Sequence, residues 1–369
     1  MKIKILQRYL LSEFLKHFII AIISLAAFYV IVDFISNIGT FTEHAPELRY
    51  VILYFIYKLP EITYRMLPLA VLLATLLSIS FFNKNNEITA VKSSGLSMFR
   101  FFLPLIVLGA VISVFAFLLS NFIVVRSNIL RSVVMQRYIN KNKTYNIGSV
   151  YQYRTKNIFI HYKHSIITAK TMEPTSKTIK GVNIYIFNDK FILNKRYIAK
   201  VGYFSKKGLE LTGVREVRFN FTNKNKAVFS EKSIKSVEIP IYLNLNFFRS
   251  YKLKPEFLSI INLSRMIAVA KKSGSGLNYI LTDYYSKLSY PVVNLILILI
   301  GISIGLILGS KGNSPISVGI SLAFAFAWWI INSIALSLGE SAQLNPLLAA
   351  FMANIIFLSF AVYLMMDID

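Results

Sequence analysis

The fold is organised around a polar stretch between two apolar runs, NKNNEITAVKSSGLS at residues 83–97. Apolar residues dominate positions 66–82 before it and 101–125 after it. A stretch this polar cannot stay in hydrocarbon, so it must surface at one side of a bilayer. Lysines outnumber its single acid, Glu87, which favours the cytoplasmic side. We therefore predict two membrane spans joined by a cytoplasmic segment.

A short amphipathic helix is predicted within this segment, at about residues 84–97. Asparagines at its start can cap it, and Glu87 in the first turn is favourable to the helix dipole. Ile88 and Val91 would share one face, and Gly95 would end the helix. Such a helix suits docking to a partner protein. A helix lying on the lipid surface fits the same pattern, and the sequence leaves both open.

The composition indicates an integral membrane protein. Hydrophobic residues make up 55% of the 369, and the mean hydropathy is +0.56. The net charge is +24, but the basic residues concentrate in the central segment and beside the spans. That placement favours anionic lipid or an anionic ligand over nucleic acid. The absence of cysteine excludes disulfides and thiol chemistry, and the four scattered histidines do not make a metal site.

Apolar runs predict an α-helical membrane protein with six transmembrane helices, three in each half of the chain. The N-terminal half, 1–125, should carry an amphipathic helix over the first sixteen positions and a helix over 50–59 that lies in the outer interface. The C-terminal half, 256–369, should begin with connecting helices. The expected spans are 18–36, 66–82, 101–124, 290–308, 316–338 and 347–366.

The segment 126–255 changes to a period-two pattern, which is typical of strands. Val182, Ile184 and Ile186 alternate with larger or polar side chains, for example. Further strands are expected at 158–162, 198–204, 217–221 and 237–241. We predict an inserted antiparallel β domain, a sandwich or an open roll. Three spans precede it after a basic, cytoplasmic N-terminus, so it should lie outside the cytoplasm, with the C-terminus inside.

The sequence lacks several motifs that are typical of nucleotide-binding and catalytic sites. No Gly-Lys dipeptide occurs, so there is no phosphate-binding P-loop, and no HExxH or CxxC motif is present. The spans carry few ionisable residues beyond Asp33, whereas ion-coupled transporters normally need such groups at mid-membrane. Asp33 is a functional candidate or an interfacial carboxylate. We expect no enzyme and no cofactor; if the chain moves something large, another subunit supplies the energy.

The whole chain resembles the LptF/LptG permease family, the membrane subunits of the lipopolysaccharide export ABC transporter. The resemblance rests on motifs in the family's order: Arg8-Tyr9-Leu10, LPLAVLL at 67–73, NEITAVKSSGLS at 86–97, GVNIY at 181–185, LELTGV at 209–214, YSKLSYP at 285–291, and LGES at 338–341 with Asn345-Pro346. The chain is more similar to the LptG branch through Val32-Asp33-Phe34 and the LGES motif. The family's β domain is periplasmic and jellyroll-like.

The resemblance implies a mechanism and partners. Two paralogous permeases, one LptF and one LptG, would enclose a cavity above a dimeric LptB-like ATPase, which uses the ATP and Mg²⁺. Lipopolysaccharide or a related glycolipid would enter laterally from the bacterial inner membrane. It would then pass through the periplasmic β domain to LptC-like and LptA-like proteins.

The resemblance also implies site residues. The coupling-helix motif places Glu87, Ile88, Val91, Lys92 and Gly95 at the ATPase.

Phe28, Val32 and Asp33 on the first span, with Phe324 and Trp328 on the fifth, would line the lateral gate and cavity. These residues equally suit ordinary packing or lipid contact. Some relatives place a lysine where this chain has Asp33, so Lys58 or Arg65 would have to hold lipid phosphates.

Two other functions remain open on the sequence. A membrane-anchored periplasmic binding or scaffold module would use the β domain as a receptor, but six spans exceed what anchoring requires. An ion-coupled lipid flippase would respond to a proton gradient instead of ATP.

Overall fold

The computed structural model describes residues 2–142, 145, 155–162, 164–173, 178–188, 191–205, 208–222, 226–240, 257–273, 277–308 and 314–366. The chain divides into two compact units. A helical unit comprises 1–144, 256–260 and 278–369, and a second unit comprises 145–255 and 261–277.

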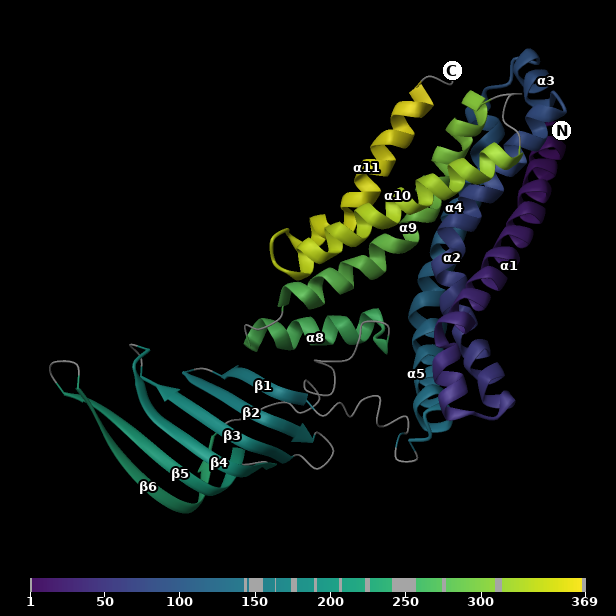
Figure 1. Cartoon of the computed structure of the whole chain (residues 1–369). Helices are drawn as coiled ribbons and strands as arrows, with labels where there is room; N and C mark the ends of the chain where they lie inside the picture. The colour runs from purple at the N-terminus through teal and green to yellow at the C-terminus, as the bar shows by residue number, and fades with distance from the viewer. Residues whose placement is uncertain are drawn as a thin grey trace. The chain divides into compact units, whose positions relative to one another are not determined.

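The helical unit contains six helices long and apolar enough to cross a membrane, among the described residues (Figure 1). The prediction of three spans on either side of an inserted domain is therefore confirmed. The six spans are α1 (Lys2–His44), α2 (Leu48–Lys84), the segment that contains α4 (Met98–Leu118) and α5 (Val125–Val133), α9 (Leu277–Leu308), α10 (Ser314–Glu340) and α11 (Pro346–Met366). The short helix α3 (Glu87–Ser93) connects the second span to the third.

The first two spans are longer than predicted. The expected amphipathic helix over the first sixteen positions and the first span are one continuous helix, α1, because no glycine or proline separates them. The expected interfacial helix 50–59 likewise continues through Pro60 and Pro68 into α2. Neighbouring membrane helices and local adjustments can satisfy the backbone groups that a proline frees, so proline need not end a span.

The third span also runs further than predicted, through two π-helical segments, η1 (Leu119–Val124) and η2 (Val134–Ile139). In η1, Ser120 Oγ and Asn121 Nδ2 each donate to the Phe117 carbonyl oxygen at 2.9 Å. Side chains that occupy a backbone carbonyl compete with the regular α-helical bond, which favours a wider turn. The helical segment continues to Ile139, and the first described strand begins at Thr155, later than the predicted boundary at 126.

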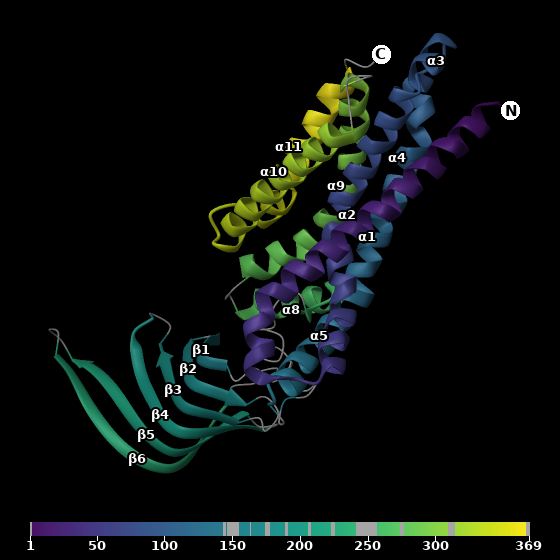
Figure 2. The ribbon, with the colours of Figure 1, turned by 45° about the vertical axis from the view of Figure 1, so that its right-hand side comes forward.

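The helical unit packs around α2 and α9. Most side chains in the apolar window of α2 are buried, whereas almost none in the apolar window of α1 is fully buried. Close packing of α2 on α9 depends on glycine: a Cβ on Gly301 would lie 2.8 Å from Thr75 Cγ2, and one on Gly305 would lie 2.7 Å from Ile79 Cγ2. Both chain termini and α3 lie at the same end of this unit (Figures 1 and 2).

The second unit contains a curved antiparallel sheet (Figure 2). Its described strands pair in sequence order as one six-stranded sheet. They are β1 (Thr155–Tyr162), β2 (Ser165–Glu173), β3 (Thr178–Phe187), β4 (Leu193–Ser205), β5 (Gly208–Thr222) and β6 (Lys226–Ile239). The helix α8 (Ile260–Ser273) also falls largely in this unit.

One face of the sheet carries an apolar core, as the alternation predicts. Ile184 pairs with Tyr197 across β3 and β4, and both belong to this core. The β4–β5 hairpin depends on Gly208, which pairs with Ser205 and has φ +136°. A Cβ there would lie 2.4 Å from the Ile239 carbonyl oxygen, so no other residue fits without moving backbone.

Candidate functional sites: the connecting helix, the gate faces and a charged cluster

Helix α3 is fixed to its own chain by its apolar face. Ile88 and Val91 are 4% and 5% exposed and pack in one cluster with Phe14, Phe82 and other residues of α1, α2 and α4. The two residues do share a face, as predicted, but that face is turned inward. They therefore hold α3 in place, and the surface left for a partner consists of other side chains.

The outward surface of α3 is polar and small. Glu87 is half-buried, and Lys92, Thr89 and Ala90 are exposed. The Tyr9 side chain on α1 lies near Glu87, so a second helix borders the carboxylate. The result is a short platform with a carboxylate at one end and a lysine at the other.

Gly95 lies just beyond α3 and shapes the turn into α4. Its φ is +73°, a left-handed conformation that glycine adopts without strain. Its amide donates to the Lys92 carbonyl at 3.0 Å, and the Ser94 amide donates to the Ala90 carbonyl at 3.1 Å. Gly95 is therefore required for its backbone conformation and not for lack of space. Apart from its two chain neighbours, no described residue has an atom within 4 Å of the position that a Cβ would take.

The first predicted gate face lies on α1. Phe28 is 67% exposed and Val32 is 46% exposed. Ile31 and Ile35 beside them are also exposed, so this face presents a continuous apolar surface. In a membrane helix such a surface contacts lipid or another apolar protein surface.

The second predicted gate face, on α10, is only partly available. Phe324 is half-buried and stacks on Phe360 of α11 with ring centroids 5.7 Å apart. Trp328 is 1% exposed, and its Nε1 donates to Asn354 Oδ1 at 3.0 Å. Asn354 Nδ2 in turn donates to the Ser289 carbonyl of α9 at 2.7 Å. Trp328 is therefore a core residue that links three helices, which corrects its predicted place on the cavity wall.

Asp33 does not stand alone in the first span. Lys58 Nζ on α2 donates to Asp33 Oδ1, and the two side chains are 10% and 13% exposed. Tyr54 completes the group: its hydroxyl lies 3.3 Å from Asp33 Oδ2 and 3.2 Å from Lys58 Nζ. The ammonium also lies over the Tyr29 ring, 5.8 Å from its centroid. Lys58 is thus already paired, and the group ties α1 to α2.

A second group ties α2 to α5. Glu61 is 6% exposed and accepts from two arginines. Arg65 Nη2 lies 2.7 Å from Glu61 Oε1, and Arg131 Nη1 of α5 donates to Glu61 Oε2. The Arg65 side chain remains 51% exposed, whereas that of Arg131 is 14% exposed.

Together these two groups form the charged cluster, defined as Asp33, Lys58, Glu61, Arg65 and Arg131. Its three cations outnumber its two carboxylates by one. Because Lys58 is buried against Asp33, Arg65 is the more accessible of the two predicted phosphate ligands.

Sequence reasoning missed Tyr54, Glu61 and Arg131 as members of this cluster. The spacing of Glu61 and Arg65, four residues apart on one helix, is a recognisable pairing pattern. Arg131 carried no such signal, because the segment beyond 126 was expected to form strands.

The apolar face of the sheet contains one buried carboxylate, Glu216, which is 4% exposed. Arg218 Nε donates to Glu216 Oε1 at 2.9 Å, and the Tyr197 hydroxyl lies 3.4 Å from the same oxygen. The hydrogen bond from Arg218 lowers the pKa of the Glu216 carboxyl, although burial opposes it. Burial raises the pKa of Tyr197, with the Glu216 charge as a further cause.

Among the described residues, no group of three or more His, Asp or Glu side chains could hold a metal ion.

The family model described as "Lipopolysaccharide export system permease LptF/LptG" matches residues 8–367, almost the entire chain. Its description covers both branches, LptF and LptG, without separating them. A search of curated proteins found no match.

Proposed function

We propose a specific role for this chain, which belongs to the LptF/LptG family of lipopolysaccharide export permeases. It is a permease subunit that takes lipopolysaccharide, or a related glycolipid, out of the inner membrane and passes it to a periplasmic bridge. A separate ATPase drives the transfer. The observation that carries the proposal is the family match across residues 8–367, through both membrane halves and the β domain.

Helix α3 is the place where the ATPase acts in this proposal. It joins two spans at the end of the helical unit that also holds both termini (Figure 1). Its inner face is anchored by Ile88 and Val91, so force applied to its polar outer surface passes directly to α2 and α4. The carboxylate of Glu87 pairs with a basic residue of the LptB-like ATPase, and that partner binds the ATP and Mg²⁺.

The lipid path begins at the exposed face of α1. Phe28 and Val32 offer an apolar surface to acyl chains, and Phe324 offers a smaller apolar surface on the second gate face, on α10. A paralogous permease, LptF or LptG, closes the cavity. Arg65 binds lipid phosphate, because its side chain is half-exposed and the charged cluster holds three cations against two carboxylates.

The β domain receives the lipid in the periplasm. Its apolar face suits acyl chains, and an outer strand of the described sheet, β1 or β6, pairs with an LptC-like domain, which leads on to LptA-like proteins. In this proposal both termini and α3 lie in the cytoplasm.

The test is reconstitution. The chain, its paralogue and the ATPase are placed in liposomes that contain lipopolysaccharide, and transfer to a soluble LptC-like or LptA-like acceptor is measured. Transfer should require ATP and the ATPase together. Transfer driven by a proton gradient without the ATPase would favour the flippase alternative, and no transfer with retained acceptor binding would favour the scaffold alternative.

A further inference from the structure

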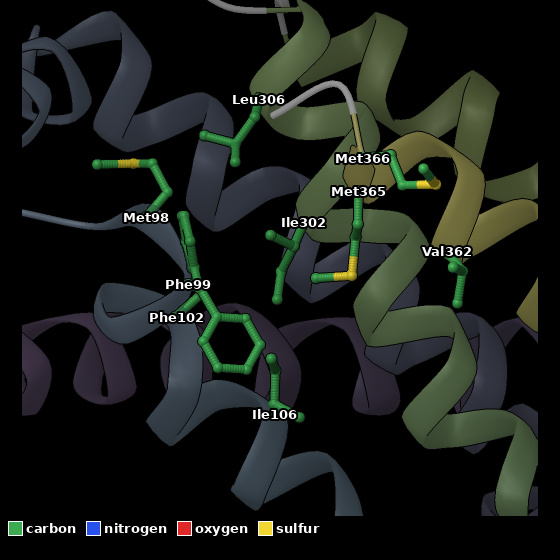
Figure 3. A pocket seen from close by; sticks show the side chains of 9 residues that line it. All are labelled: Met98, Phe99, Phe102, Ile106, Ile302, Leu306, Val362, Met365 and Met366. Carbon is green, nitrogen blue, oxygen red and sulfur yellow. The ribbon is translucent and has the colours of Figure 1, made fainter. Parts of the chain in front are cut away.

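The helical unit contains an apolar pocket of about 350 Å³ that none of the proposed functional surfaces uses. Three spans form it, and Figure 3 shows Phe102, Ile106 and Ile302 converging on it. Among the described residues, every one that lines the pocket is apolar: Met98, Phe99, Phe102, Ile106, Ile302, Leu306, Val362, Met365 and Met366.

The pocket lies at the ends of these spans and reaches the surface. Met98 is the first residue of α4, and Met366 is the last residue of α11. Phe99, Val362 and Met366 are 54%, 50% and 78% exposed, so one side of the pocket opens outward. In spans of this length and apolarity, that side faces the hydrocarbon of one leaflet, close to its headgroups.

The chemistry of the lining restricts the occupant. Water needs several polar partners to stay in a cavity, and none of the nine lining side chains is polar. Three methionines give the wall an adaptable surface that fits a flexible chain. The volume lies at the lower end of the range of small-ligand sites, which suits a single hydrocarbon chain.

We infer that this pocket binds one acyl chain of a bilayer phospholipid from the adjoining leaflet. The inner wall supports α3, because Met98 and Phe102 belong to the same apolar cluster as Ile88 and Val91. An acyl chain in the pocket completes the packing of that cluster from the lipid side. The inference requires only that the chain spans a membrane, so it stands or falls separately from the transport function.

Photocrosslinking of lipid tests the inference. The full chain is placed in nanodiscs of phosphatidylethanolamine and phosphatidylglycerol that carry a trace of phosphatidylglycerol with a diazirine on one acyl chain. Labelled residues are identified by mass spectrometry. We expect Met365 in the pocket to be labelled more strongly than Val114, which is 60% exposed on α4 outside the pocket.

Two matched substitutions separate the pocket from ordinary lipid contact. Ile106→Trp narrows the pocket and should lower labelling at Met365 about tenfold, because displacing about two methylenes removes that much burial free energy. Val107→Trp, one position along and 55% exposed outside the pocket, should leave the labelling unchanged. If Ile106→Trp does not fold, Val362→Trp narrows the pocket from the opposite wall.

Two results would overturn the inference. One is labelling of Met365 no stronger than that of Val114, or equal in all variants, which would show surface lipid only. The other is a Phe99→p-benzoylphenylalanine variant that crosslinks to a polypeptide, either a second copy or another membrane subunit, in place of lipid.

Discussion

Replacing Asp33 with asparagine removes the carboxylate that neutralises Lys58. The two side chains are 13% and 10% exposed, so the remaining ammonium is buried against neutral acceptors, the introduced amide oxygen and the Tyr54 hydroxyl, which lies 3.2 Å away. Removing one member of a buried ion pair costs about 3–5 kcal/mol. Since the pair joins α1 to α2, we expect Asp33→Asn to loosen the contact between these helices. The thermal midpoint should fall by on the order of 10 °C.

Spin-label distance measurement reports this change directly. The sequence contains no cysteine, so single cysteines can be introduced and labelled without background. Ile35 on α1 and Ile52 on α2 are 61% and 51% exposed and serve as label sites. The distance distribution between them should be narrow in the parent chain and broad in Asp33→Asn.

The control is removal of both charges. Asp33→Asn with Lys58→Met leaves no uncompensated ion, and replacing a buried pair by apolar residues is often nearly neutral. The double variant should therefore recover a narrow distribution. An unchanged distribution in the single variant, or a double variant as perturbed as the single, would refute the reasoning.

Three further predictions follow from the other charged sites. Glu61→Gln leaves Arg131 buried without its carboxylate and should lower the free energy of unfolding by about 3–5 kcal/mol. The control Glu47→Gln, at an exposed pair with Arg49, should change the free energy of unfolding by about 0.5 kcal/mol or less. Equal effects of the two substitutions in thermal unfolding would contradict the account. Glu87→Ala should leave the chain inserted but weaken co-purification of the ATPase by about thirtyfold or more, and unchanged co-purification together with unchanged transport would remove Glu87 from the docking surface. In the β domain, the lowered pKa of Glu216 stabilises the sheet above the ordinary pKa of glutamate, and this stability is lost as the pH falls through the lowered value. Hydrogen exchange in β5, corrected for intrinsic rates, should show Glu216→Gln less protected than the parent chain at pH 7 and the two alike in strong acid; a difference that persists in acid would show that the charge is not the cause.

The spans were predictable because hydrophobicity is continuous along each of them. Their lengths were less predictable, since a proline such as Pro60 ends a soluble helix far more readily than a membrane helix surrounded by others. The strand β2 was missed because the adjacent Ile166 and Ile167 interrupt a simple alternation. The extension of the third span depends on side-chain bonds within η1, which no periodicity reveals.

The candidate sites were predictable only where one segment carries the signal. The motif around Glu87 lies in a single loop, so its place between two spans could be read from the sequence. The charged cluster joins helices across 25 residues in one pair and 70 in another, and such pairing depends on how the helices rotate against each other. Trp328 illustrates the same limit, because its burial depends on a hydrogen bond to Asn354, on a different helix.

The most direct test of the central claim is photocrosslinking from α1 to the transported lipid. Phe28→p-benzoylphenylalanine is expressed with the paralogous permease and the ATPase in membranes containing lipopolysaccharide. The matched control is Val114→p-benzoylphenylalanine, on an equally exposed position of α4. The account predicts that Phe28, and not Val114, crosslinks to lipopolysaccharide and that ATP lowers the yield as lipid leaves. Equal crosslinking at both positions, unaffected by ATP, would contradict it.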